Sequence, residues 1–121
     1  MESLDPDVVI NVAKGLRPVR PNTHQFPLED TVDFDITPHL DPIADLIHQH
    51  MAAGKKVFAH CRAGLSRLPT VIVAYLVKHV GMPLTKALRL VSDRRQDGRA
   101  LPTNPSFLTQ LHAWDRQRAV P

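Results

Sequence analysis

The sequence has few of the residues that mark secreted or membrane proteins. It contains one cysteine, Cys61, so no disulfide can form within the chain, and a lone thiol is typical of a reducing compartment. The longest apolar run, "TVIVAYLV", is much shorter than the ~20 residues that a membrane-spanning helix needs. The opening "MESLDPD" is acidic and lacks the apolar segment of a signal peptide. We therefore expect no membrane association and a cytoplasmic and/or nuclear location.

Aromatic residues are also scarce, at 5% of the chain. They do not alternate with the basic residues, whereas proteins that bind single strands of nucleic acid combine aromatic stacking with a basic groove. The net charge is only +3. We expect no nucleic-acid partner, and the mild basic excess is instead compatible with acidic or phosphorylated partners.

The length of 121 residues predicts a single domain covering residues 1–121. β-Branched residues predict buried strands at "DVVINV", which ends at Val12, and at "KKVFAH", with a short extended piece near Gln25 and Phe26. A helix lies between these two strands and another follows the second. This order predicts an α/β fold, with parallel strands in a small sheet flanked by helices.

Turn and cap residues set the predicted helix limits. The first helix is expected to have Thr37 or Asp41 as its cap and to stop at Gly54, and the second to open at Pro69 and end near Gly81. A third helix covers "PLTKALRLVSDRR", and the last covers "TNPSFLTQLHAWDRQR". Asn104 is the expected cap of that last helix, with Pro105 as its first residue.

Cys61 directly follows a predicted strand, and ligands of α/β folds bind beyond the carboxyl ends of the strands. In "HCRAGLSR" the residues after Cys61 form a short loop that leads into a helix N-terminus. Their backbone N–H groups can converge on an anion and stabilise a thiolate, whose ordinary pKa is ~8.5. Arg67 adds a guanidinium that can bind a phosphate through two hydrogen bonds. The segment therefore predicts a loop that binds a phosphate group, with the Cys61 sulfur at its base in position to attack phosphorus.

The same segment resembles the signature of the cysteine-dependent protein phosphatases: His-Cys, five residues, then Arg. The flanking stretches "HLDPIADLIHQHMAAGKKVFAHCRAGLSR", "TVIVAYLVKHVGMPLTKALRLVSDRR" and "NPSFLTQLHAWDRQ" resemble the small atypical dual-specificity phosphatases. The resemblance covers most of the chain, from about Val8 to Gln117.

This resemblance implies that Cys61 attacks phosphorus to form a phosphocysteine and that Arg67 binds the phosphate and stabilises the transition state. His60 would support the loop and help to keep the thiolate pKa low. The mechanism requires neither a cofactor nor a metal. The expected phosphate-binding loop consists of Arg62, Ala63, Gly64, Leu65, Ser66 and Arg67.

The resemblance also implies a general acid on a loop well upstream of the cysteine. In "QFPLEDTVDFD" the aligned residue is Asp30, with Asp33 as the main alternative and with Asp35 and Glu29 as further nearby carboxylates. Relatives specific for phosphotyrosine have a deep pocket walled by a tyrosine before the nucleophile. The only tyrosine here is Tyr75, after the loop. We therefore expect a shallow pocket and phosphorylated proteins as substrates, carrying phosphotyrosine, phosphoserine or phosphothreonine.

The sequence departs from the family pattern at two places. Leu68 stands where a serine or threonine normally donates a hydroxyl hydrogen bond to the cysteine sulfur, so we expect the phosphoenzyme to be hydrolysed slowly. The first strands of the family domain are largely missing, so a sheet edge is expected to be uncovered and to permit a homodimer. Two other functions remain open: a weakly active or inactive relative that captures phosphorylated partners, and a lipid or RNA 5′-phosphatase.

Overall fold

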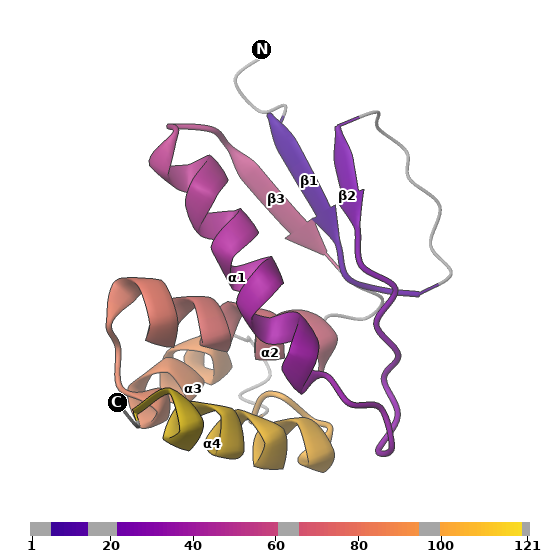
Figure 1. Cartoon of the computed structure of the whole chain (residues 1–121), viewed down its shortest axis with the longest axis vertical. Helices are drawn as coiled ribbons and strands as arrows, with labels where there is room; N and C mark the ends of the chain where they lie inside the picture. The colour runs from indigo at the N-terminus through magenta and orange to yellow at the C-terminus, as the bar shows by residue number, and fades with distance from the viewer. Residues whose placement is uncertain (1–5, 15–21, 61–65, 95–99, 120–121) are drawn as a thin grey trace.

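The computed structural model describes residues 6–14, 22–60, 66–94 and 100–119, and it has an α/β fold built on a parallel sheet. The sheet contains β1 (Val8–Asn11), β2 (Thr23–Gln25) and β3 (Val57–His60) in the order β2-β1-β3. Val9 of β1 pairs with Thr23 of β2 on one side and with Phe58 of β3 on the other, and both pairings are parallel. All three carboxyl ends therefore lie at one edge, toward the helices (Figure 1).

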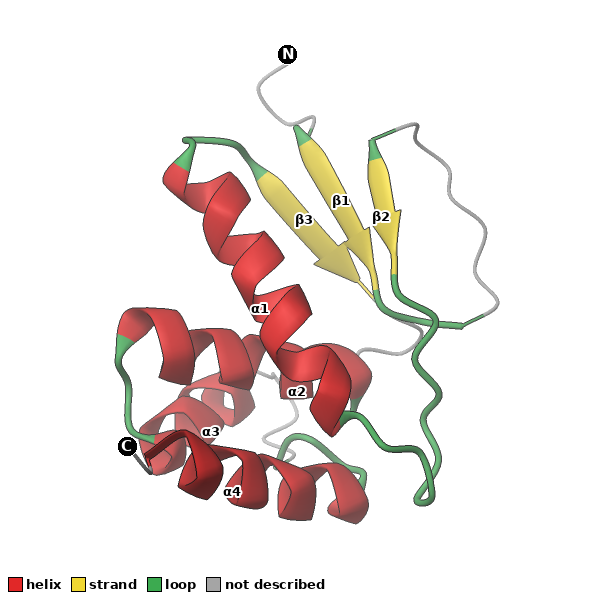
Figure 2. Ribbon diagram, in the orientation of Figure 1, coloured by secondary structure: helices red, strands yellow, loops and turns green. Residues whose placement is uncertain are grey.

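α1 (Thr37–Ala52) connects the sheet strands and lies beside β3 (Figure 2). Its predicted end is confirmed, since Gly54 follows with φ +79°, a conformation that favours glycine. Its predicted cap is wrong. Ile36 occupies the N-cap and has no capping side chain, while Asp41 lies within the helix and accepts a hydrogen bond from Trp114 Nε1 at 3.3 Å.

α2 (Arg67–Tyr75) begins two residues before the predicted Pro69 and runs into a π-helical turn, η2 (Leu76–Val80). Gly81 follows with φ +83°, as the predicted helix end requires. α3 (Leu84–Asp93) and α4 (Pro105–Ala119) complete the described helices. Asn104 caps α4 as predicted, because its Oδ1 accepts the backbone N–H of Ser106 at 2.9 Å.

The core lies between the sheet and the helices. Val8 and Ile10 of β1 alternate into it, as residues of one strand face must. The helices contribute side chains at helical spacing, and these are almost fully buried. They include Leu40, Ile43 and Ile47 of α1, Val71, Val73 and Ala74 of α2, and Phe107, Leu111 and Trp114 of α4. In the described ranges, no helix has both the length and the apolar character that crossing a bilayer demands.

Candidate active site

The predicted phosphate-binding loop connects the carboxyl end of β3 to the first turn of α2. Cys61 and the loop residues Arg62, Ala63, Gly64 and Leu65 lie outside the described residues, and of His60 only the backbone is described. Ser66, Arg67 and Asp30 are described, together with their surroundings.

Arg67 is the first residue of α2 and is only 8% exposed. Its Nη1 donates a hydrogen bond to the backbone carbonyl of Leu28 at 3.1 Å. Its Nε is buried and has no hydrogen-bond partner among the described residues. Leu28 is fully buried, so its carbonyl is a fixed anchor for the guanidinium. A buried guanidinium donor without a partner is costly for folding, and an anion beside it would remove that cost.

Asp30 lies two residues after Leu28 and is held by α4. The side-chain amide of Asn104 donates from Nδ2 to Asp30 Oδ1 at 3.0 Å and to the carbonyl of Thr31 at 3.1 Å. Asp30 and Asp33 are both exposed, but no contact of this kind is described for Asp33 in residues 22–60. Between Asp30 and its main alternative Asp33, Asp30 is therefore the one whose carboxylate is held by a described hydrogen bond.

Ser66, a member of the predicted phosphate-binding loop, contacts the same asparagine. Its Oγ accepts the backbone N–H of Asn104 at 3.1 Å and lies 2.8 Å from Thr103 Oγ1. The Ser66 carbonyl accepts the hydroxyl of Thr70 at 2.6 Å. Asn104 thus contacts the loop residue Ser66 through its backbone and Asp30 through its side chain. The sequence identified Asn104 only as a helix cap, and no local pattern indicated its contact with Asp30.

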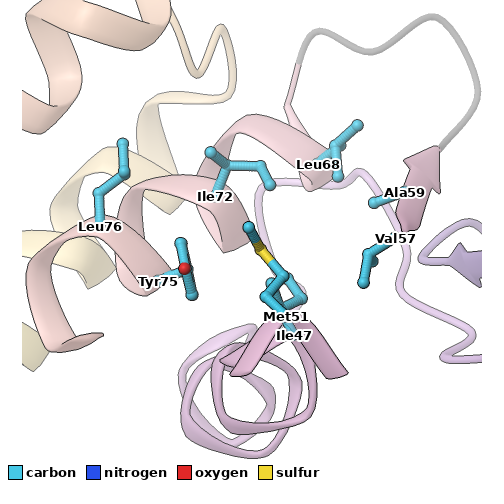
Figure 3. A pocket seen from close by; sticks show the side chains of 8 residues that line it. All are labelled: Ile47, Met51, Val57, Ala59, Leu68, Ile72, Tyr75 and Leu76. Carbon is cyan, nitrogen blue, oxygen red and sulfur yellow. The ribbon is translucent and has the colours of Figure 1, made fainter. Parts of the chain in front are cut away.

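Leu68 faces an apolar cavity instead of the polar network. It is half-buried and lines a space of about 260 Å³ with Ala59, Ile72 and other apolar side chains. Figure 3 shows this cavity between α1, α2 and β3, with Leu68 at the end nearest β3's Ala59. Leu68 therefore belongs to an apolar surface directly after the predicted phosphate-binding loop.

Clear pKa shifts in the described residues occur away from this site. Between α1 and η2, a hydrogen bond from Lys78 lowers the pKa of the Asp45 carboxyl, with His79 adding to the effect against the opposing effect of burial. The Lys78 Nζ lies 2.8 Å from Asp45 Oδ1, and His79 Nε2 lies 2.7 Å from the same oxygen. No group of three or more histidine, cysteine, aspartate or glutamate side chains suited to a metal ion occurs among the residues that the structure describes.

Comparison with known proteins places the chain in one family. The model of the family described as "Dual specificity phosphatase, catalytic domain" matches residues 1–117. Because the match covers nearly the whole chain, it includes both loops of the site and the α4 cap.

Individual relatives agree with the family match. The chain is 37% identical to dual specificity protein phosphatase 1B of Arabidopsis thaliana over 111 residues, covering 89% of this chain and 65% of the relative. It is 31% identical over 123 residues to dual specificity protein phosphatase 1 of the same plant, covering 99% of this chain and 61% of the relative. The crystal structure of human DUSP28 superposes with a TM-score of 0.83 at 27% identity, covering 93% of this chain and 76% of that one. The chain thus spans somewhat under two thirds of the plant relatives.

Proposed function

This chain belongs to the dual specificity phosphatase catalytic-domain family, and we propose that it hydrolyses phosphotyrosine, phosphoserine and phosphothreonine in proteins through a phosphocysteine intermediate. The observation that supports this most directly is the placement of Arg67 and Asp30. The buried guanidinium is anchored on Leu28, two residues before Asp30, while Asn104 joins Asp30 to the loop residue Ser66. This arrangement supports Arg67 as the group that binds the phosphate and Asp30 as the proton donor.

In the first step, the Cys61 thiolate attacks phosphorus and the bond from phosphorus to the ester oxygen breaks. Asp30 gives its proton to the departing oxygen, which leaves as an alcohol or phenol. Arg67 and the loop N–H groups balance the negative charge on the phosphoryl oxygens. The products are the dephosphorylated side chain and phosphorylated Cys61.

In the second step, the Asp30 carboxylate accepts a proton from water as that water attacks phosphorus, and the sulfur leaves as a thiolate. A hydroxyl at position 68 would donate to the departing sulfur, whereas Leu68 cannot. Losing one such donor typically costs about 3 kcal/mol at the step it serves. We therefore propose that hydrolysis of the phosphocysteine limits turnover.

We propose that the partners are phosphorylated proteins of the cytoplasm or nucleus, and that neither nucleic acid nor a membrane has a role. We also propose a second copy of the chain as a partner at the edge of the sheet. A shallow pocket would admit the short phosphoserine and phosphothreonine side chains as well as phosphotyrosine. Tyr75 lines the apolar cavity together with Met51 and Leu76. This placement supports a substrate pocket whose wall does not include Tyr75.

Rapid mixing with a chromogenic aryl phosphate, followed by intact-mass analysis of acid-quenched protein, tests the proposal. We expect a burst equal to the enzyme concentration and a phosphate adduct, both lost in Cys61→Ser. Leu68→Ser should raise the steady rate about tenfold or more, if a hydroxyl donor recovers part of the ~3 kcal/mol.

The alternative function is that of a phosphate-binding relative, which captures phosphorylated partners without hydrolysing them. The absence of a hydroxyl at Leu68 favours this alternative. Folded protein that shows no burst, adduct or turnover, yet binds phosphopeptides through Arg67, would replace the enzyme proposal with this one.

A further inference from the structure

The loop between β2 and α1 contains a tight turn directly after the expected general acid. The carbonyl of Thr31 accepts the backbone N–H of Phe34 at 3.4 Å. This bond closes a turn that has Val32 and Asp33 at its two central positions. Because Asp30 directly precedes the turn, these two side chains are presented next to the group proposed to protonate the leaving oxygen.

Helix α4 holds the turn at both ends. Asn104 donates from Nδ2 to the carbonyl of Thr31 at 3.1 Å, and Gln110 donates from Nε2 to the carbonyl of Phe34 at 2.9 Å. The Phe34 ring also stacks on His39 of α1, with 5.6 Å between the ring centroids. Figure 1 shows the loop beside the start of α4. A turn anchored in this way loses little conformational freedom when it contacts a ligand.

The two side chains at the tip of the turn face solvent. Val32 is 70% exposed, the highest value among the large apolar side chains that the structure describes. Two nearby carboxylates are engaged: Glu29 by Lys14 at 3.5 Å, and Asp35 by a backbone N–H of α1 at 3.3 Å. By contrast, no hydrogen bond or ion pair reaches the Asp33 carboxylate from the part of the chain that the structure describes. The tip thus offers one apolar group and one negative charge.

A phosphoserine or phosphothreonine substrate has to bring its backbone to this turn. The leaving oxygen that Asp30 would protonate is bonded to the β-carbon of the substrate residue, so the peptide backbone passes beside the acid. Val32 and Asp33 are at most ~7 and ~11 Å along the chain from Asp30. Consecutive residues of an extended peptide are ~3.4 Å apart. The substrate residues that flank the phosphorylated one therefore come within reach of both side chains.

We propose that the turn of residues 31–34 selects substrates by the residues that flank the phosphorylated side chain, with Val32 contacting an apolar residue and Asp33 a basic one. The inference rests on the proposed function and defines the sequence context of its phosphoserine and phosphothreonine substrates. A single exposed valine is ordinary on a protein surface. Here it lies on a loop that a rigid helix fixes beside the acid, the kind of position from which loops recognise ligands. Acidic neighbours are disfavoured, because Asp33 repels them.

Binding of phosphopeptides to Cys61→Ser protein tests this selection without requiring turnover. Each peptide contains one phosphoserine, and the residues within three positions of it are replaced one at a time by leucine, glycine, lysine or glutamate. Fluorescence anisotropy gives the Kd of each peptide. We expect one flanking position at which leucine binds about fivefold to tenfold more tightly than glycine. At another, lysine should bind about fivefold more tightly than glutamate.

Two substitutions separate the two contacts. Val32→Ser should abolish the preference for leucine and keep the preference for lysine, and Asp33→Asn should do the reverse. Val80→Ser and Asp7→Asn are the matched controls and should change neither preference. Val80 is 54% exposed on η2, and Asp7 precedes β1 at the end of that strand away from the site. A general acid at position 33 would instead slow the hydrolysis of every phosphoserine peptide and leave the lysine-to-glutamate ratio of Kd values unchanged.

The outcomes distinguish this inference from the proposed function. Peptides that do not bind, that bind with equal Kd whatever their neighbours, or whose preferences survive Val32→Ser and Asp33→Asn would overturn the inference. Turnover of an aryl phosphate, which has no flanking residues, tests the phosphatase proposal separately. Activity on the aryl phosphate without any flanking preference would leave that proposal in place and remove the turn as a source of specificity.

Discussion

At the scale of single residues, Asn104 has two separable roles. Its Oδ1 caps α4, and its Nδ2 holds Asp30 and the Thr31 carbonyl. Asn104→Asp keeps an oxygen for the cap but removes the donor and sets a second carboxylate against Asp30. If Asp30 is the general acid, proton donation to the leaving group is impaired.

We expect Asn104→Asp to lower kcat/KM by roughly tenfold to a hundredfold on phosphoserine peptides, a part of the 10²–10⁴-fold that a general acid contributes. The loss should be much smaller on an aryl phosphate whose leaving group needs little protonation. Steady-state kinetics on the two substrates measure this difference. Asn22→Asp, the same change at an asparagine whose amide binds the carbonyl of Asp7, is the control. An equal loss on both substrates would argue against positioning of the acid.

At the scale of helices, the start of α1 is bonded by α4 as well as by the neighbouring Asp35, whose Oδ1 accepts the backbone N–H of Thr37 at 3.3 Å. The Oε1 of Gln110 accepts the backbone N–H groups of Ile36 at 2.9 Å and Thr37 at 3.2 Å. Its Nε2 donates to the carbonyl of Phe34 at 2.9 Å. The amide of Gln110 therefore does for α1 what a local cap residue does for other helices.

Gln110→Ala should lower the free energy of unfolding by about 1–2 kcal/mol, as loss of a helix cap does. Gln110→Glu loses the hydrogen bond to the Phe34 carbonyl, but it retains the acceptor oxygen and adds a negative charge near a helix N-terminus, where it is favourable. It should therefore lower the free energy of unfolding by less than Gln110→Ala does. Urea unfolding of the three proteins, with amide exchange at Ile36 and Thr37, measures the effect. Equal destabilisation by both substitutions would show that packing of Gln110 matters and capping does not.

The contact between α1 and η2 makes stability depend on pH. Because the pKa of Asp45 is lowered in the folded protein from its ordinary value of 3.8, its contribution is fully present above that value. The Asp45 contribution to stability is lost as the pH falls through the lowered folded pKa.

The contribution of Lys78, the partner of Asp45, has the opposite dependence on pH. Burial acts to lower the pKa of Lys78, but the hydrogen bonds that Lys78 donates to Asp45 and Asp41 outweigh it and raise that pKa. Its contribution is therefore present below the ordinary value of 10.5 and is lost as the pH rises through the folded pKa.

Asp45→Asn should destabilise the protein at pH 7 by well under about 1 kcal/mol, because the carboxylate is half exposed and screened by solvent. The difference from the wild type should shrink below pH 3.8. Urea midpoints at neutral and acid pH provide the measurement. Asp93→Asn, at an exposed residue for which no ion pair is described in residues 66–94, is the control. A difference that stays constant with pH would exclude this ion pair as its source.

At the scale of the whole molecule, anion binding should be coupled to folding. Phosphate, tungstate or vanadate bound beside Arg67 would supply an acceptor for its buried Nε, and a ligand specific to the folded state stabilises it. At a free concentration a hundredfold above Kd the gain is about 2.7 kcal/mol, visible as a raised Tm. Arg67→Lys should lose most of this gain, whereas Arg89→Lys, at an exposed arginine of α3, should keep it. Equal gains in both variants would place the anion elsewhere.

The sequence alone determined the features that depend on neighbouring residues. β-Branched runs gave the strands β1 and β3, and their separation by a helix predicted the parallel pairing. Gly54, Gly81 and the Asn104–Pro105 pair marked helix ends correctly, because backbone conformation and capping at these positions depend on one or two adjacent side chains. The family motif around Cys61 is equally local, since a loop between a strand and a helix is contiguous in the chain.

Only the tertiary structure decided which distant residues meet. The cap of α1 comes from Gln110, Asp30 is held by Asn104, and Ser66 contacts Thr103, across separations of 73, 74 and 37 residues. Hydropathy and helix period carry no signal for such polar contacts, which arise when the core brings α4 against the loops. The same packing turned Leu68 toward the apolar cavity between α1, α2 and β3. Local chemistry thus fixed the elements and the motif, and burial of the shared core fixed how Asp30, Arg67 and Asn104 are arranged.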